Sequence, residues 1–247
     1  MTTSTPIRQQ PARPGAFPAR PPLQNGDRLS RDEFEKRCSA MPEHFKAELI
    51  EGTVYIMASP VSESHSGSHF NLVSWLGLYR LKTEGVVGGD NGTLRLDLDN
   101  EPQPDAVLRI LPTYGGQSRV DADDYVTGAP ELVAEVAASS ASYDLHAKLH
   151  AYRRNGVREY IVWRIFDQAI DWFVLREGTF QPLPSGSDGI VRSEVFPGLW
   201  LDPAALVAGD LNRVNVVLQQ GLISPEHAAF QGRIQQIRKD STSSGKH

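Results

Sequence analysis

The chain has 247 residues, a formal net charge of −5 and one cysteine, Cys38. This length suits one domain with tails, and a lone cysteine excludes an intrachain disulfide, which fits a reducing cytoplasm. No apolar stretch approaches the roughly 20 residues of a membrane-spanning helix, so we expect a cytoplasmic protein without membrane association. The acidic balance counts against a uniformly basic DNA-coating surface, but it allows a local basic groove.

The two ends of the chain differ in composition from its middle. Residues 1–28 are rich in Pro, Ala, Arg and Gln and lack apolar periodicity, which predicts a disordered tail. We expect one domain over residues 29–208. Residues 209–240 carry apolar side chains at helical spacing, which predicts one or two helices that dock on the domain or on a second subunit. We expect residues 241–247 to be disordered.

The domain is predicted to begin with a short helix and a hairpin. Residues 30–33 (Ser-Arg-Asp-Glu) have the form of a capping box, which predicts a helix that continues to about Cys38. Residues 46–50 and 53–57 are rich in strand-forming side chains. They flank Glu51-Gly52, so we expect an antiparallel hairpin with a two-residue turn.

A long helix and three strands are expected next. Residues 62–82 have a broad apolar face at helical spacing, which indicates packing on a sheet. Strands are predicted at residues 86–87, 93–96 and 105–110. Residues 111–128 then form an expected loop, and loops of this length are often functional or mobile.

The following segment predicts the topology of the sheet. A strand at residues 132–137, a helix at 143–155 and a strand at 159–163 make a strand–helix–strand unit. The two strands of such a unit run parallel with a right-handed crossover. Strands at residues 170–175 and 179–183 then add an antiparallel extension. The predicted fold class is therefore α/β (mixed α+β), with a central mixed sheet flanked by helices.

Two acids stand in or beside apolar strands. Glu135 lies within a strand in which it shares a face with Val133 and Ala137, and Asp105 opens an earlier strand. A buried carboxylate is costly unless it is paired or binds a metal, so two such strands suggest a shared cation. The alternatives are an exposed edge strand for Glu135 and a simple turn residue for Asp105.

Lys148 and Glu48 are further candidates. Lys148 lies on the predicted helix that follows the Glu135 strand, and this helix should pack on that strand, so the lysine can point toward the acids. The alternative is a surface ion pair with Asp144, one helical turn away. Glu48 lies in the predicted hairpin, where a surface position is equally compatible with the pattern.

Other motifs favour less specific interpretations. His65 and His69 are one helical turn apart, a spacing seen in metal sites. The sequence shows no intervening Glu and no third ligand, so we favour a helix-terminus role over a zinc site. Neither a phosphate-binding glycine loop nor a dinucleotide fingerprint is present, and Cys38 has no evident catalytic partner.

Six short motifs occur in a specific order. They are AELIEG at 47–52, SP and ESH within 59–65, QPD at 103–105, APELVAEV at 129–136, K, Y and GVREY within 148–160, and FPGL at 196–199. Over about residues 29–207 their order and spacing resemble the Uma family of restriction-endonuclease-like proteins, a bacterial branch of the PD-(D/E)xK nuclease superfamily. The resemblance implies a restriction-endonuclease-like fold with a central mixed sheet.

The resemblance also implies roles for individual residues. Asp105 and Glu135 match the two acids of the family, Lys148 its helix-borne lysine and Glu48 its early glutamate, and all four are implied to be catalytic. Asp105, Glu135, Glu48 and the backbone carbonyl of Val136 are the implied ligands of Mg²⁺, with Mn²⁺ as a substitute.

One position departs from the superfamily pattern. The superfamily has a lysine two residues after the second acid, where this chain has Ala137. In this branch the lysine has moved to the helix, which Lys148 satisfies.

The expected function is that of a Mg²⁺-dependent endonuclease, a hydrolase that cleaves phosphodiester bonds in nucleic acid. DNA is the expected substrate, and we expect a homodimer. Two alternatives remain: a nuclease-fold module that binds nucleic acid or protein without cleavage, and an oligomeric interaction protein that acts through its C-terminal helices.

Overall fold

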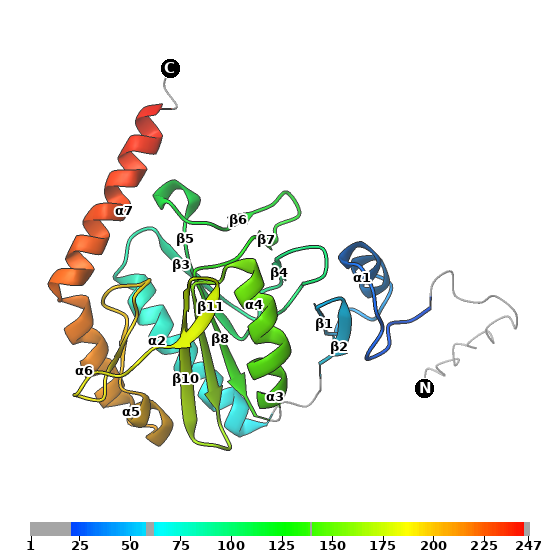
Figure 1. Cartoon of the computed structure of the whole chain (residues 1–247), viewed down its shortest axis with the longest axis horizontal. Coiled ribbons are helices and arrows are strands. Elements are labelled where there is room, and N and C mark those ends of the chain that lie inside the picture. The colour runs from blue at the N-terminus through cyan, green and yellow to red at the C-terminus, as the bar shows by residue number, and fades with distance from the viewer. Residues whose placement is uncertain (1–20, 58–61, 139, 245–247) are drawn as a thin grey trace, which may run out of the picture.

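The computed structural model describes residues 21–57, 62–138 and 140–244. A six-stranded sheet lies at its centre, in the strand order β11-β10-β9-β8-β5-β3 (Figure 1). Within this sheet β8 and β9 pair in parallel and the other described pairs are antiparallel. The predicted mixed sheet is confirmed. Its strands are β3 (Val86–Asp90), β5 (Ala106–Ile110), β8 (Leu132–Ala137), β9 (Glu159–Arg164), β10 (Ala169–Arg176) and β11 (Thr179–Pro182).

Helices cover both faces of the sheet, because alternate residues of its strands place apolar side chains on each face. Leu132, Ala134 and Val136 of β8 face the main core, which includes residues of α2 (Glu63–Leu81). Val133 and Ala137 face a second core. That core packs against the segment formed by α3 (Ala141–Tyr143), the π-helical turn η2 (Asp144–Lys148) and α4 (Leu149–Asn155). The regular helix predicted over residues 143–155 is therefore wrong in detail, because one turn is π-helical.

The N-terminal part holds a small unit beside the sheet. Helix α1 (Arg31–Cys38) and the hairpin of β1 (Ala47–Ile50) and β2 (Thr53–Ile56) form as predicted. In the hairpin turn, residues 51–52 both have positive φ, as a tight two-residue turn requires. The predicted capping box is wrong. The Ser30 side chain makes no capping bond, and the Glu33 carboxylate accepts a hydrogen bond from Arg37.

The expected loop at residues 111–128 contains structure of its own. It includes the 3-10 turn η1 (Pro112–Tyr114) and strands β6 (Arg119–Val120) and β7 (Val126–Thr127), which join β4 (Leu94–Arg95) in a three-stranded sheet. The turn between β6 and β7 is closed by Asp121, which accepts hydrogen bonds from the amides of Asp123 and Tyr125. Two further short strands, β12 (Val191–Arg192) and β13 (Trp200–Leu201), pair near the C-terminal helices.

The C-terminal helices belong to the same core as the sheet. They are α5 (Pro203–Ala208), α6 (Leu211–Leu222) and α7 (Pro225–Ser244), and Leu218 and Phe230 are buried in the main core. Because α7 continues to Ser244, the tail predicted from residue 241 is wrong over its first four residues. No helix in the described ranges is both long and apolar enough to cross a membrane.

The predicted N-terminal tail is wrong for its last eight residues. Leu23 is buried against the small core that contains Phe34 and Leu49, and Arg28 forms a β-bridge with Thr53. Residues 1–20 and 245–247 lie outside the described residues, so the prediction for them is untested.

Candidate active site

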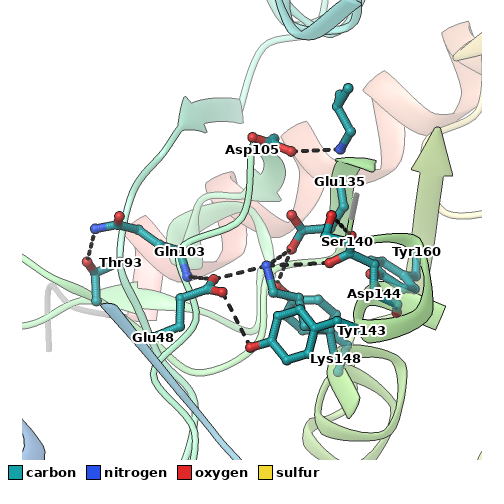
Figure 2. Close-up of polar contacts among 12 residues, drawn as sticks. Glu48, Thr93, Gln103, Asp105, Glu135, Ser140, Tyr143, Asp144, Lys148 and Tyr160 are labelled. Carbon is teal, nitrogen blue, oxygen red and sulfur yellow. Dashed lines mark hydrogen bonds and ion pairs between the residues drawn. The ribbon is translucent and has the colours of Figure 1, made fainter. Parts of the chain in front are cut away.

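Strand pairing brings Asp105 and Glu135 together. Ala106 on β5 pairs with Ala134 on β8 in an antiparallel register, so the residue before β5 falls beside Glu135. The carboxylate Oδ2 of Asp105 accepts a hydrogen bond from the backbone amide of Val136 at 2.7 Å (Figure 2). The two acids that the sequence singled out therefore share one end of neighbouring strands.

Lys148 joins the acids from the opposite side of the site. Its Nζ atom lies 2.9 Å from Oε1 of Glu135, 3.0 Å from Oε1 of Glu48 and 3.7 Å from Oδ1 of Asp144 (Figure 2). All four side chains are 5% exposed or less. The surface alternatives for Lys148, Glu48 and Glu135 are therefore wrong: these charges are buried and bound to one another.

Glu48 lies on β1 of the hairpin, and a backbone amide binds its carboxylate. Oε1 of Glu48 accepts a hydrogen bond from the amide of Gln103 at 2.7 Å, and Oε2 accepts one from the hydroxyl of Tyr143 at 3.4 Å. The ring of Tyr143 in turn packs against Tyr55 of β2, with ring centroids 4.3 Å apart. Residues from β1, from the segment before β5 and from the helical segment thus meet at one carboxylate.

Two hydroxyl groups also bind carboxylates of this cluster. The Tyr152 hydroxyl donates to Oε1 of Glu135 at 2.8 Å, and the Ser140 hydroxyl donates to Oδ2 of Asp144 at 2.6 Å. Sequence reasoning missed these hydroxyls and Tyr143 as parts of the site. Tyr152 carried a usable signal, because it lies one helical turn after Lys148 and so shares its face.

The site holds more negative than positive side chains. Burial, reinforced by the charges of Asp144, Asp105 and Glu48, raises the pKa of Glu135 well above its usual range despite the nearby ammonium of Lys148. Burial also raises the pKa of Asp144. For Lys148, burial alone would lower the pKa, but the surrounding carboxylates outweigh it and raise the pKa. The single ammonium of Lys148 therefore compensates the charge of several acids only in part. The remaining negative charge favours binding of a further cation.

Two histidines of α2 lie beside Asp105. Nε2 of His69 is 2.9 Å from the backbone oxygen of Asp105, and Nε2 of His65 is 3.8 Å from its Oδ1. The two rings stack with centroids 6.2 Å apart. The helix-terminus interpretation of His65 was therefore incomplete. Their i, i+4 spacing was the signal, but the sequence alone could not show that they face Asp105.

The donor set suits a hard cation, although a complete metal site is not formed. Within the described ranges no group of three His, Cys, Asp or Glu side chains is arranged to hold a metal ion. A cation does lie between two of the carboxylates, namely the ammonium of Lys148 between Glu48 and Glu135. Carboxylate oxygens are the ligands that Mg²⁺ prefers, so the chemistry of the residues present fits this ion.

Known proteins resemble this chain both in sequence family and in fold. The model of the Uma2 family, described as "Putative restriction endonuclease", matches residues 31–204, and no curated protein matches the chain. Among solved structures, the chain is similar to "a putative nuclease belonging to DUF820" from Anabaena variabilis. The TM-score is 0.54 at 16% identity, over 72% of this chain and 99% of that one.

The structural likeness concerns the fold, whereas the family match spans the segment that carries all four acids and the lysine of the cluster. From its sequence, this chain belongs to the Uma2 family.

Proposed function

We propose that this protein is a divalent-metal-dependent endonuclease that hydrolyses phosphodiester bonds of DNA at the cluster of Glu48, Asp105, Glu135 and Lys148. The observation that carries this proposal is the meeting of Asp105 and Glu135 at the ends of adjacent strands, with the Lys148 ammonium 2.9 Å from Glu135. Membership of a family described as restriction endonucleases supports the reaction class.

Mg²⁺, or Mn²⁺ in its place, is the cofactor of this proposal. Asp105, Glu135 and Glu48 would hold it with carboxylate oxygens, together with the backbone carbonyl of Val136. When bound, such an ion offsets charge on the phosphate and lowers the pKa of a coordinated water. The surplus of acids over the single lysine is the electrostatic reason for the ion to bind here.

Hydrogen bonds within the protein orient the carboxylates of the proposed site. The amide of Val136 holds the carboxylate of Asp105, and the hydroxyl of Tyr152 holds that of Glu135. Lys148 keeps its proton because carboxylates surround it, so it supplies a fixed positive charge that offsets the negative charge developing on the phosphate.

The direct test is cleavage of supercoiled and linear DNA in Mg²⁺ or Mn²⁺. We expect cleavage that EDTA abolishes and that the variant Asp105→Asn lacks, while Glu43→Gln, an exposed acid on the surface, cleaves normally. Circular dichroism establishes that each variant is folded. Cleavage that survives in Asp105→Asn would contradict the assignment of the site.

Two observations favour a second function. The acids of Glu48 and Glu135 are already neutralised in part by Lys148, and no three-ligand metal arrangement is formed among the described residues. These features suit a nuclease-fold module that binds nucleic acid without cutting it. A folded protein that binds DNA but leaves it intact in both metals would favour this function over the nuclease.

A further inference from the structure

The two edge strands of the central sheet differ in how well they are protected against pairing with another strand. At one edge β11 ends in Pro182, a residue without an N–H that blocks the addition of another strand. At the other edge β3 exposes Gly88, Gly89 and Asp90 to solvent. An unprotected edge strand is a template for pairing with another chain.

The register of β3 shows which of its backbone groups face outward. The carbonyl of Gly85 accepts from the amide of Leu111, and the amide of Asn91 donates to the carbonyl of Asp105. Odd-numbered residues of β3 therefore bond to β5. Because antiparallel ladders alternate, the amides and carbonyls of Gly88 and Asp90 point away from the sheet.

A groove with both signs of charge runs along this edge. A cavity of about 170 Å³ lies between α2 and β3, and Arg80 and Asp90 are among its lining residues. In the part of the chain that the structure describes, neither charge has an ion-pair partner. Arg80 lies over Gly88: its Cδ atom is 3.9 Å from the position that a Cβ on Gly88 would take. The edge thus carries one acid, one base and free backbone groups.

We propose that β3 is a homodimer interface, in which two copies of the chain pair their β3 strands antiparallel about a two-fold axis at Gly89. In this register Gly88 pairs with Asp90 of the second copy, so the outward-facing backbone groups of both strands are satisfied. Gly88 and Asp90 share the face covered by α2, since alternate strand residues share a face. Arg80 above Gly88 therefore meets the Asp90 carboxylate of the second copy, and symmetry repeats this ion pair.

The charges along β3 favour a second copy of the chain as the partner of this edge. A two-fold interface must be complementary to itself. A patch with one base and one acid, neither of which has an ion-pair partner among the described residues, satisfies this condition. The proposal does not depend on the chemistry of the candidate active site.

Sedimentation equilibrium of the full chain tests the interface. We expect a species of twice the 27.2 kDa monomer mass. Arg80→Glu and Asp90→Arg should each weaken the dimer by about tenfold or more, because each sets like charges against one another at two symmetric places. The double variant Arg80→Glu/Asp90→Arg should regain the wild-type dissociation constant. Lys36→Glu and Glu43→Arg, which are exposed on the α1 side of the molecule, should leave the dimer unchanged.

A backbone-centred variant completes the test. Gly89→Lys places two lysines opposite each other at the axis, and a Cβ at Gly89 meets no neighbour closer than 3.7 Å, so the monomer should fold. We expect this variant to be monomeric. A monomeric wild type, a dimer that Gly89→Lys does not weaken, or a double charge variant weaker than both single variants would overturn the proposal.

Discussion

Two buried glutamates on neighbouring strands have opposite surroundings. Glu135 on β8 and Glu159 on β9 are both almost fully buried within apolar strands. Glu135 is bound by the ammonium of Lys148 and the hydroxyl of Tyr152, and other acids lie beside it. Among the residues that the structure describes, no ammonium or guanidinium group donates a hydrogen bond to Glu159.

The donors that the structure describes for Glu159 are neutral groups. Its Oε1 accepts from the amides of Glu194 and Val195, and its Oε2 accepts from the hydroxyl of Ser193 and the indole of Trp172. These bonds tie the loop before the FPGL motif to the sheet. Burial of an acid in a strand therefore does not identify a functional site by itself. Glu135 differs from Glu159 because several other charged side chains lie close to it.

The largest expected effect is on the charged cluster. Lys148→Met leaves Glu48 and Glu135 buried without a cation, so we expect a loss of about 3–5 kcal/mol in the free energy of unfolding at neutral pH in EDTA. Mn²⁺ should recover part of this loss. Urea unfolding measures it, with the exposed Lys36→Met as control. A loss below about 1 kcal/mol would mean that Lys148 is not the main counter-charge of the cluster.

The next effect concerns Glu159 and pH. Burial raises the pKa of Glu159 from 4.5 to about 7, although hydrogen bonds partly oppose this rise. The folded state therefore holds the proton more tightly than the unfolded state. The stability that this proton supplies is complete below about pH 4.5 and is lost as the pH rises to about 7, by about 3 kcal/mol.

The variant Glu159→Gln isolates that contribution. Its amide oxygen still accepts hydrogen bonds but does not titrate, so the stability of the variant relative to wild type should increase between pH 4.5 and 7. Urea unfolding across this range measures the difference. Parallel stability curves for the two proteins would show that Glu159 does not titrate in this range.

How far the sequence predicted this site depends on how local each feature is. The β8–β9 unit was predicted because its strands and helix are consecutive, and the parallel pairing follows from that connection. The prediction that Asp105 and Glu135 lie together depended on short sequence motifs. Glu48 reaches the cluster through long-range contacts that the local pattern left open, among them the bridge between Leu49 and Glu101 and the bond from the Gln103 amide.

Other features had no local signal. The π-helical turn at Asp144–Lys148 inserts into a stretch with ordinary helical periodicity, and such turns are frequent at functional sites. The strands β6 and β7 have two residues each, which is too short for alternation to reveal. The rule that a strand acid indicates a cation would also have selected Glu159, where neutral donors satisfy the carboxylate.

The substitution that removes one hydroxyl from the cluster should change the unfolding free energy least. Tyr152→Phe deletes the hydrogen bond to Glu135 while Lys148 remains. We expect a loss of about 1.5–3 kcal/mol in unfolding free energy, since one hydrogen bond to a buried charged group is removed. A loss as large as that of Lys148→Met would place the hydroxyl, not the ammonium, as the main partner of Glu135.

Mn²⁺ binding, followed by electron paramagnetic resonance, distinguishes the Glu135 cluster from the Glu159 site. Wild type, Asp105→Asn, Glu135→Gln and Glu159→Gln would be titrated under the same conditions. We expect wild type and Glu159→Gln to bind one ion with equal affinity, and the two cluster variants to lose at least about tenfold in affinity. Equal binding by all four proteins would contradict the assignment of the Glu135 cluster, and not Glu159, as the functional acid site.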